Sequence, residues 1–568
     1  MSDLLWEIAE YDDKILSQLI GDFGLTRLSA MVLANRGTAL DQVEQFLRPK
    51  LRSLVDPYIF PGLEKAAARI WQAVTNGEKI VIHGDYDTDG VTSSALIAWV
   101  LRESGGDVTC FVPHRLEDGY GLTPSSVVKI SVSNPKLLIT VDCGINSCDA
   151  TAKATELGID VIITDHHEPR EVLPAAYAVI NPKLTDNVNN LHDLAGVGVT
   201  FKVCHAFLKY GRDHSIGGMS VDLKDGLDLV ALGTVADIVP LLGENRCLVK
   251  HGMRVLSAQR RPGIRALCEI SRLQHDIKPS DITYRLAPRL NAAGRMGDAT
   301  DAMHMHQCEY IVEAYSLANK LDECNKRRQA QERETLASAM QQIETENLAE
   351  RTTIVVYGHG WHLGVVGIVA SRLVQSYRRP CVVLSINSDG VVHGSGRSVD
   401  GVNLVQALDS CSAHLDRYGG HPMASGLTLA EGNLPAFRKA FEARIDGLCN
   451  GSTESFRPRL KIDGDASLAQ LDDNFFAELE DLQPFGHSHP APRFRFQRVR
   501  CDRLQRAGDS NTRGTMYDDS GAQMPFIAFG REPRDFPDGP WDVAACPELN
   551  EHNNNVYPQI QIQAVQSV

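Results

Sequence analysis

Residues 78–90, EKIVIHGDYDTDG, decide the fold, because an apolar strand stops there and charged side chains follow at once. His83, Asp85, Asp87 and Asp89 crowd the end of this segment. Burying such carboxylates without partners is expensive, so a core strand cannot hold them and divalent cations would relieve their repulsion. A solvated acidic loop is the alternative. An EF-hand is excluded because the glutamate that closes its calcium loop is absent.

Three further segments repeat the pattern of a short apolar run with polar residues at its end. They are PKLLITVDCG (135–144), IDVIITDHH (159–167) and AYAVINP (176–182). Helical stretches such as VTSSALIAWVLRES (91–104) separate them. Near-continuous apolar strands that alternate with helices indicate an α/β fold with a mostly parallel sheet covered on both faces. In such sheets the ligand site lies at the carboxyl ends of the strands.

Acids and imidazoles occupy these predicted strand ends. Asp142, Asp165 and His166 each follow an apolar run, and Asp237 lies alone in the helical segment GTVADIVP. Mixed carboxylate and imidazole ligands favour Mn²⁺, with Mg²⁺ as the alternative, and the lack of thiolate ligands disfavours structural zinc. About six ligands predict two divalent metal ions about 3.5–4 Å apart, which activate water for phosphoester hydrolysis.

The rest of the chain predicts further domains. A segment without Gly or Pro at 311–347 reads as a long connecting helix, a second α/β segment follows it, and the last 110 residues or so read as short strands typical of an OB-like β-barrel. The expected parts are an N-terminal segment (1–50), a catalytic domain (51–307), the helix (308–350), a substrate-binding domain (351–450) and the barrel (458–568).

Composition excludes several classes of protein. The chain has 568 residues, 43% hydrophobic, with a net charge of −15. Disorder, collagen and a coiled-coil rod are excluded, and the charge argues against a histone-like nucleic-acid binder, although local basic patches still set the field that a phosphate feels. The 13 cysteines include no C-x-x-C pair. With no apolar stretch of about 18 residues and no secretory signal, we expect a soluble cytoplasmic protein without a membrane segment.

Two sets of residues, from three segments, are candidates for binding phosphate. GSGRS (394–398) and GGHPMASG (419–426) supply Ser395, Arg397 and His421, and their glycines would let backbone N–H groups approach an anion. An ordinary tight turn is the alternative for a glycine-rich stretch. RLAPRLNAAGRMGDA (285–299) supplies the second set, which consists of Arg289, Asn291 and Arg295.

An arginine-rich strand in the barrel is the third candidate for nucleic-acid binding. Phe494 and Phe496 alternate with arginines, so a strand places aromatic rings on one face and cations on the other. The alternative is that the rings are core and the arginines merely solvated. The cationic face would follow the backbone of a single strand, with binding that weakens in salt. The predicted contacts are Arg493, Arg495, Arg498 and Arg500.

HGDYDTDG, VDCG, DHH and ADIVP, in this order, resemble the four motifs of the DHH phosphoesterase superfamily. The second α/β segment (351–450) is similar to the substrate domain associated with that superfamily. Together with the long helix and the terminal barrel, the order of domains resembles that of the single-strand-specific exonucleases of the superfamily. The resemblance implies removal of 5′-mononucleotides from single-stranded DNA in the 5′→3′ direction, in recombination and repair. Polarity and the preference for DNA follow from the resemblance alone. It also implies a single-strand-binding protein and a helicase as partners.

The resemblance assigns roles to the residues at the strand ends. One metal would be held by His83, Asp87 and a bridging Asp142. The other would be held by Asp89, Asp142, His166 and Asp237. Asp85 would lie behind the ligands or hold the partner of the attacking water. Asp165 would orient His166 or support the backbone turn, and His167 would donate to the scissile phosphate or leaving oxygen. Arg295, Ser395 and Arg397 are the expected 5′-phosphate pocket.

Other functions remain open from the residues. A phosphodiesterase for oligoribonucleotides or cyclic dinucleotides would share the metal site without needing the long helix or the arginine-rich barrel. A catalytically inactive scaffold is disfavoured by the intact set of metal-ligating residues. A nuclease for duplex DNA is a further alternative, which rapid digestion of blunt ends would support.

Overall fold

The computed structural model describes residues 4–113, 119, 121–216, 221–274, 276–501, 503–508, 510–552 and 555–568. The chain forms two compact units. The first contains residues 7–322 and 461–568, and the second contains residues 323–460 with residues 4–6. Residues 51–307, which the sequence predicts to be catalytic and which we call the catalytic region, therefore belong to the same unit as the barrel, and the long helix begins in one unit and ends in the other.

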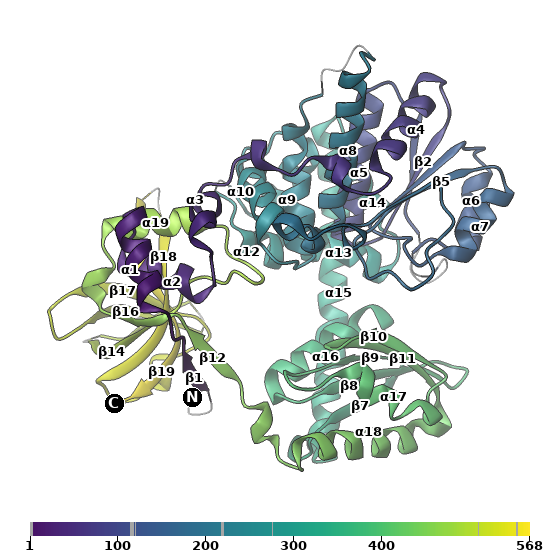
Figure 1. Cartoon of the computed structure of the whole chain (residues 1–568). Helices are drawn as coiled ribbons and strands as arrows, with labels where there is room; N and C mark the ends of the chain where they lie inside the picture. The colour runs from purple at the N-terminus through teal and green to yellow at the C-terminus, as the bar shows by residue number, and fades with distance from the viewer. Residues whose placement is uncertain are drawn as a thin grey trace. The chain divides into compact units, whose positions relative to one another are not determined.

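A five-stranded parallel sheet forms the centre of the catalytic region (Figure 1). Its strand order is β3-β2-β4-β5-β6, and every neighbouring pair is parallel. This confirms the predicted α/β fold. The strands are β2 (Ile80–Gly84), β3 (Val108–Phe111), β4 (Leu137–Val141), β5 (Asp160–Thr164) and β6 (Ala178–Ile180).

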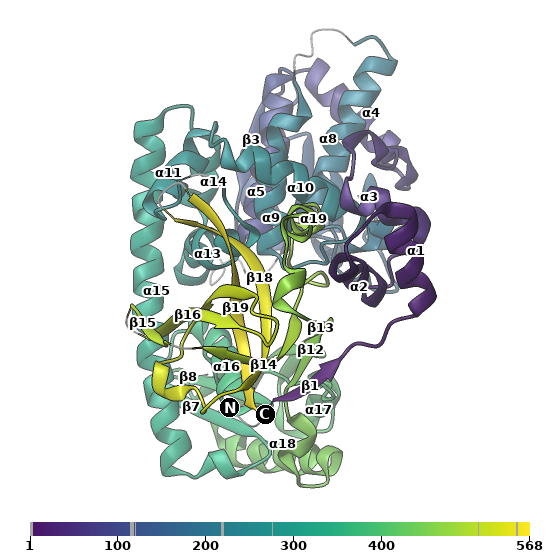
Figure 2. The same cartoon turned by 90° about the vertical axis from the view of Figure 1, so that its left-hand side faces the viewer.

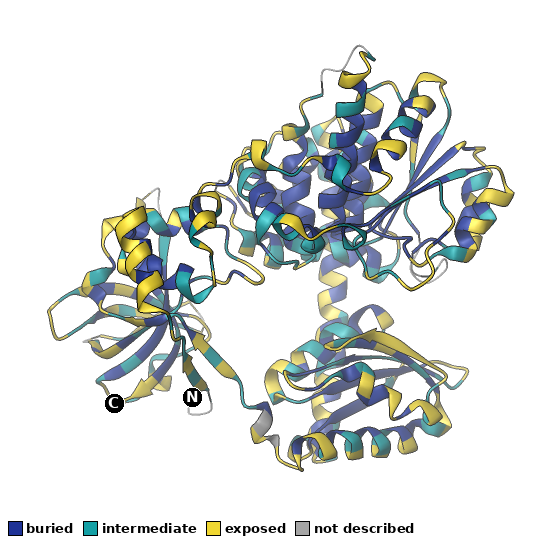
Figure 3. Cartoon of the chain, in the orientation of Figure 1, coloured by how far each residue is buried: buried dark blue, intermediate teal, exposed yellow. Residues whose placement is uncertain are grey.

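Alternating side chains of these strands enter two different cores. Ile80 and Ile82 pack in the larger core with α4 (Leu63–Thr75), α5 (Thr88–Glu103) and α8 (Gly196–Asp213). Val81 packs on the opposite face with α6 (Pro124–Ser131) and α7 (Cys148–Glu156). Both faces are thus covered, which is why the strands read as continuous apolar runs. Figure 3 shows the strands buried and the outer helix faces exposed.

Helices complete the catalytic region after the sheet. The segment η7 (Ile282–Leu286) forms a π-helical turn that runs directly into α13. The helices are α9 (Leu227–Ala236), α10 (Gly243–Ser257), α11 (Pro262–Ile270), α12 (Pro279–Asp281), α13 (Ala287–Met296), α14 (Thr300–Gln307) and α15 (Ile311–Thr345). The last of these is the predicted connecting helix.

The C-terminal strands close into a barrel. The sheet order is β13-β14-β18-β19-β17-β16-β15, and an additional pairing of β14 with β16 closes five of the strands into a ring. The helix α19 (Asp473–Leu482) precedes β14. Its strands are β13 (Gly464–Ala466), β14 (Phe494–Cys501), β15 (Gln505–Ala507), β16 (Asn511–Tyr517), β17 (Gln523–Ala528), β18 (Trp541–His552) and β19 (Asn555–Ser567). The preceding strand β12 (Arg459–Ile462) pairs instead with β1 (Leu5–Ile8) in a two-stranded sheet.

The N-terminal segment contributes to the barrel's core, which the sequence did not indicate. Leu28 and Met31 of α2 (Arg27–Asn35) share one buried cluster with Phe475 of α19 and Phe494 of β14. Figure 2 shows these N-terminal helices beside α19. The other N-terminal elements are β1 (Leu5–Ile8), α1 (Asp13–Phe23) and α3 (Val43–Leu47).

The second unit is a mixed five-stranded sheet of order β10-β11-β9-β8-β7. One face packs against α17 and α18, and the other packs against α16 and the last turns of α15. Its elements are β7 (Ile354–His359), α16 (Leu363–Tyr377), β8 (Cys381–Ile386), β9 (Val391–Arg397), α17 (Leu404–Asp409), β10 (Arg417–His421), β11 (Ala424–Ala430) and α18 (Leu434–Cys449). Across the described parts of the chain, no helix combines the length and apolar character needed to cross a membrane.

Candidate metal centre and phosphate-binding residues

The first acidic loop joins β2 to α5. Asp87 is the N-cap of α5, and its carboxylate accepts a hydrogen bond from the Gly90 amide at 3.1 Å. A Cβ on Gly90 would lie 2.5 Å from the carbonyl oxygen of Asp85. Glycine at this position therefore allows the first turn of α5 to pack closely against the loop. The loop and this turn together carry Asp85, Asp87 and Asp89.

Asp89 is held by a helix more than one hundred residues further along the chain. Its carboxylate accepts from the amides of Gly196 at 2.7 Å and Val197 at 2.8 Å, in the first turn of α8. An anion at this position satisfies two N–H groups that have no partner within the helix. Sequence reasoning missed Gly196 and Val197, because nothing in their local sequence marks a backbone donor.

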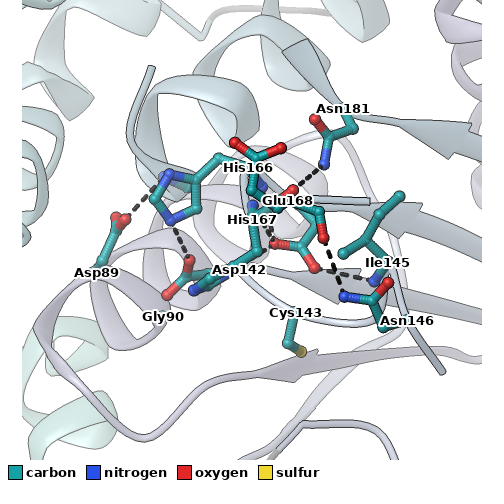
Figure 4. A network of polar contacts seen from close by, with 12 residues as sticks. Asp89, Gly90, Asp142, Cys143, Ile145, Asn146, His166, His167, Glu168 and Asn181 are labelled. Carbon is teal, nitrogen blue, oxygen red and sulfur yellow. Dashed lines mark hydrogen bonds and ion pairs between the residues drawn. The ribbon is translucent and has the colours of Figure 1, made fainter. Parts of the chain in front are cut away.

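Asp142 lies at the centre of the site. It follows β4 in a left-handed conformation with φ of 60°, and its side chain is 2% exposed. Nε2 of His166 lies 3.2 Å from its Oδ1, an atom that accepts no hydrogen bond from the residues that the structure describes (Figure 4). A Cβ on Gly196 would lie 2.5 Å from the same oxygen. Glycine at position 196 therefore lets the first turn of α8 approach this carboxylate closely.

His166 and Asp237 complete this side of the site. The Nε2 atom of His166 lies 3.6 Å from Oδ2 of Asp237, which is the C-cap of α9. A Cβ on Gly233 would lie 3.0 Å from Oδ1 of Asp89, so α9 also approaches the site closely. The predicted convergence of Asp89, His166 and Asp237 is what the structure shows.

Asp165 orients His167 rather than the ring of His166. Its Oδ1 accepts from Nδ1 of His167 at 2.7 Å and from the amides of His166 and His167. Its Oδ2 accepts from the Ile145 amide at 2.9 Å. The prediction that Asp165 orients the His166 ring is therefore wrong, whereas the alternative role, support of the backbone turn, is present.

Within the described ranges of the chain, three groups of ligand atoms have the spacing of metal sites, with all atoms of a group within 4.8 Å of one another. Asp142 belongs to two of them, as a shared ligand would. The groups are Asp85 with Asp87 and Asp142, Asp89 with His166 and Asp237, and Asp142 with His166 and His167.

His83 lies beside these groups and in none of them. Its ring stacks on Phe111 with centroids 5.5 Å apart, and its Nδ1 lies 3.5 Å from Sγ of Cys143. The first group instead contains Asp85, which the family pattern placed behind the ligands. The structure favours Asp85 as the third oxygen ligand, and the assignment of His83 as a ligand stays a prediction.

Burial and the charges of neighbouring acids make the carboxyl groups of this site difficult to ionise. Burial, followed by the charge of Asp87, raises the pKa of Asp85 to about 8 and that of Asp89 to about 7. Burial, followed by the charge of Asp89, raises the pKa of Asp237 to about 9 and that of Asp142 well above its usual range.

These residues fit divalent cations. Burial, followed by the charge of His167, lowers the pKa of His166 to about 3, so this imidazole is neutral and can act as a ligand. Hard oxygen donors with one neutral imidazole suit Mn²⁺ and Mg²⁺, and bound cations would remove the repulsion that raises the carboxylate pKa values.

Two of the three residues of α13 that were predicted to bind phosphate, Arg289 and Asn291, make hydrogen bonds within the protein. Nε of Arg289 donates to Asp322 of α15 at 2.8 Å. Oδ1 of Asn291 accepts from the amide and the hydroxyl of Thr88 at 2.8 and 2.7 Å, which fixes the start of α5. Arg295 lies half-buried in the last turn of α13 and remains the candidate for phosphate binding in this segment.

In the second unit, GSGRS is part of β9 and not a turn. Both neighbours of β9 pair with it, so its backbone groups belong to the sheet and the predicted backbone cradle for an anion is wrong here. The side chains remain suitable. Arg397 donates to the Ser395 hydroxyl at 2.9 Å, and His421 lies in the same row across β10, β11 and β9.

The barrel's arginines are largely paired with acids. Phe494 and Phe496 are buried in the barrel, which confirms the predicted alternation of β14. Arg495 binds Asp465 through two hydrogen bonds at 2.6 and 2.8 Å, and Arg493 donates to the carbonyl of Lys461. Arg498 and Arg500 both lie near Asp519, at 3.9 and 3.5 Å. The net positive charge of this face is smaller than the sequence predicted.

Comparison with known proteins identifies three family domains along the chain. Residues 79–234 match the N-terminal domain of the DHH family, residues 350–447 match the DHHA1 domain, and residues 462–564 match the RecJ OB domain.

The curated relatives and solved structures agree with these domains. The single-stranded-DNA-specific exonuclease RecJ of Bacillus subtilis is 35% identical over 99% of this chain and 70% of its own length. The RecJ of Dickeya dadantii is 39% identical over 79% of this chain and 80% of its own. A crystal structure of RecJ from Thermus thermophilus in complex with Mn²⁺ superposes with a TM-score of 0.83 at 28% identity, covering 100% of this chain and 80% of that one.

Proposed function

Because the chain belongs to the RecJ family of single-stranded-DNA-specific exonucleases, we infer that it hydrolyses phosphodiester bonds of single-stranded DNA at the edge of its parallel sheet. The observation that carries this function is the set of buried carboxylates at the ends of β2 and β4, which share ligand positions and, among the described residues, form no ion pair with a lysine or arginine. By family resemblance the strand is degraded from its 5′ end to mononucleotides, in DNA recombination and repair.

Two sets of residues would hold the divalent cations. One consists of Asp85, Asp87 and Asp142, with His83 beside it. The other consists of Asp89, His166 and Asp237, with Asp142 shared between both. Bound Mn²⁺ or Mg²⁺ supplies Lewis acidity at the attacked phosphorus. The glycines at positions 196 and 233 let α8 and α9 approach the carboxylates of Asp142 and Asp89 closely.

His167 is the proposed proton donor to the scissile phosphate or leaving oxygen. Burial opposes its charge, but the hydrogen bond and the charge of Asp165 raise the pKa of His167 to about 9. The ring is therefore protonated at neutral pH and oriented through Nδ1 by Asp165. Asp165 itself keeps its charge. Although burial opposes ionisation, the His167 hydrogen bond lowers the pKa of Asp165.

The remaining polar residues are proposed to bind the strand. Ser395, Arg397 and His421 share one face of the second unit's sheet and would bind phosphate through the guanidinium and hydroxyl. A Cβ on Gly367 of α16 would lie 3.0 Å from Nη2 of Arg397, so the helix leaves room for this side chain. Arg295 in the first unit is proposed for the same task. The barrel arginines would track the backbone to the extent that their aspartate partners permit.

A single-strand-binding protein and a helicase are proposed partners, and the cytoplasm is the proposed location. Only the family resemblance supports these partners. Co-purification of each purified partner with the full chain at physiological salt would test them, and no retention at micromolar concentration would contradict them.

The defining experiment follows product release from one single-stranded oligonucleotide labelled at either end. With Mn²⁺ or Mg²⁺, the 5′-labelled strand should release labelled mononucleotide at once, whereas the 3′-labelled strand should shorten progressively. Chelator should stop both reactions. Faster hydrolysis of dinucleotides than of long strands would instead support a small-substrate phosphodiesterase, and rapid digestion of blunt duplex would contradict single-strand specificity.

Asp87→Asn is the informative variant for this assay. Asn preserves the N-cap of α5, because Asn and Asp cap helices about equally well, but it removes a metal-binding charge. Asp149→Asn, in the exposed first turn of α7, is the control for loss of one acid. Activity should vanish in the first variant and persist in the second. An active Asp87→Asn protein would contradict the proposed centre.

A further inference from the structure

A polar cavity of about 360 Å³ lies in the first unit, away from the metal ligands. Its walls come from the segment that joins α2 to α3, the loop around Asn189, and the first turn of α10. Figures 1 and 2 both place α3 beside α10. We call it the arginine cavity, and its principal side chains are Arg36, Gln42, Gln45, Asn189, Asn190 and Arg246.

Arg246 brings a buried positive charge to this cavity. The residue is 1% exposed, and its guanidinium stacks over the Phe46 ring at 4.0 Å. It donates to the carbonyl of Phe46 in α3 and to the carbonyls of residues 481–484, which lie at the end of α19 and in the loop that follows it. These dipoles satisfy the hydrogen bonds without neutralising the charge. Burial, followed by the charge of Arg36, lowers the pKa of Arg246 to about 9.

Arg36 is the second cation. Its Nη1 lies 2.5 Å from Nδ1 of His489, and its Nη2 donates to the carbonyl of Pro490 at 2.6 Å. Burial lowers the pKa of Arg36, and the nearby charge of Asp463 offsets this only in part. Among the described residues, neither Arg36 nor Arg246 lies within ion-pair distance of a carboxylate, and no described residue that lines the cavity is acidic.

The opposite wall is neutral and rigid. Asn189 and Asn190 both have left-handed backbones, with φ of 53° and 58°. Asparagine tolerates this conformation better than most residues. A Cβ on Gly243 would lie 2.1 Å from the Asn189 carbonyl oxygen, so only glycine lets this loop lie against α10. The wall presents the carboxamide of Asn189, which can donate hydrogen bonds and carries no charge, whereas the carboxamide of Asn190 already donates to Oδ2 of Asp193 at 3.4 Å.

We propose that the arginine cavity binds a phosphate group at a site separate from the metal centre. Two guanidiniums that repel each other, carboxamide donors and no acidic side chain favour an oxyanion and exclude a cation. The volume is at the lower end of the range for small-ligand sites. The phosphate could belong to a free nucleoside monophosphate or to the backbone of a DNA strand, and the two sources are separable by experiment.

The first test measures thermal unfolding of the full chain in EDTA, with phosphate or with chloride at matched ionic strength. Phosphate should raise the midpoint of the wild type with increasing concentration. Asn189→Asp places a nearly isosteric carboxylate opposite the arginines. This variant should start from a higher midpoint in chloride and lose the response to phosphate. Asn134→Asp is the control, because Asn134 is also left-handed, with φ of 53°, and is exposed elsewhere.

The second test distinguishes the two sources by calorimetry with deoxyadenosine monophosphate, deoxyadenosine and a single-stranded oligonucleotide in EDTA. If the monophosphate is the ligand, it should bind where the nucleoside does not, and about tenfold or more weakly to Asn189→Asp. If a strand phosphate is the ligand, Asn189→Asp should reduce the salt slope of oligonucleotide binding by about one. Equal responses of wild type, Asn134→Asp and Asn189→Asp in both tests would overturn the proposal. Because EDTA removes the metals, the outcome is independent of nuclease activity.

Discussion

The metal centre and the arginine-rich face of the barrel are both clusters of like charge in the sequence, but the fold treats them in opposite ways. At the metal centre, the described structure contains no lysine or arginine paired with Asp85, Asp89 or Asp142. In the barrel, the guanidinium of Arg495 is paired with Asp465 through two hydrogen bonds. The acids of the first cluster therefore remain available for a ligand, and much of the charge of the second is already neutralised.

This difference separates a strong site from a weak one. Buried acids without counter-charges destabilise the folded protein until cations bind, so the binding energy is concentrated there. Exposed arginines paired with aspartates retain little field and are screened by salt, so each contributes little to binding. Like-charge clustering in a sequence thus indicates a ligand only where the fold provides no partner.

Asp142→Asn should have the largest effect. Burial and the charge of Asp89 raise the pKa of Asp142 well above its usual range, so this side chain must take up a proton when the metal-free protein folds at neutral pH, which costs stability. A neutral Asn removes this penalty and also a shared ligand. Nuclease activity should fall about 10³-fold or more. The unfolding midpoint in EDTA should rise, by about 2–4 °C for each kcal/mol recovered.

The two readouts of this variant have opposite signs, which makes the result difficult to imitate by misfolding. Mn²⁺ should raise the unfolding midpoint of the wild type and have little effect on Asp142→Asn. Asp149→Asn serves as the control. A variant that is inactive and also less stable in EDTA would show that Asp142 supports the fold, contrary to the charge argument.

Gly196→Ala should have the next largest effect, through shape and not charge. The added Cβ would lie 2.5 Å from Oδ1 and 2.7 Å from Cγ of Asp142, so that carboxylate must move. Manganese affinity and activity should each fall about 10–100-fold, as expected when a residue that positions a metal ligand is changed. Gly21→Ala is the control, since a Cβ there meets nothing within 4 Å. Wild-type manganese affinity in Gly196→Ala would show that Asp142 need not keep its present position.

Local sequence was sufficient for the sheet and for most of the site. Ile80, Val81 and Ile82 are apolar because both faces of β2 are covered, and the acids at the strand ends follow from the parallel topology. Phe494 and Phe496 were predictable from the alternation of β14.

Partners distant in the sequence could not be predicted. Asp89 is held by the amides of Gly196 and Val197, and Arg495 meets Asp465 on another strand. Residue type does not reveal such contacts, because any residue has an amide and any aspartate can pair. The glycines of GSGRS were misread for a related reason. A Cβ on Gly394 would lie 2.2 Å from Cδ2 of Leu384, so this glycine serves close packing within the sheet and not an anion.

Arg513→Ala should weaken single-strand binding more than the loss of a paired arginine does. Arg513 is exposed on β16 and has no ion pair within the described structure. Its removal should lower the salt slope by about one and the affinity a fewfold in fluorescence anisotropy with EDTA.

The matched comparison for Arg513→Ala removes a neutral pair. The double variant Arg495→Ala/Asp465→Ala leaves the net charge unchanged, and it should bind within about twofold of the wild type because the pair contributes little field. A larger loss in the double variant than in Arg513→Ala would mean that Arg495 contacts the strand despite its partner.

Asp519→Asn should have the smallest effect. Unlike Arg513→Ala, it should strengthen the binding of single-stranded DNA. Asp519 lies 3.5 Å from Arg500 and 3.9 Å from Arg498, and all three side chains are about half exposed or more. Releasing both arginines should raise affinity for single strands about two- to fivefold at low salt, since exposed pairs are worth at most about 1 kcal/mol. The gain should disappear at high salt, where screening removes the field. Asp538→Asn changes the net charge equally from an exposed site of the same unit. An equal gain in both variants would show a general charge effect, and the aspartate would then not be the residue that restrains this face of the barrel.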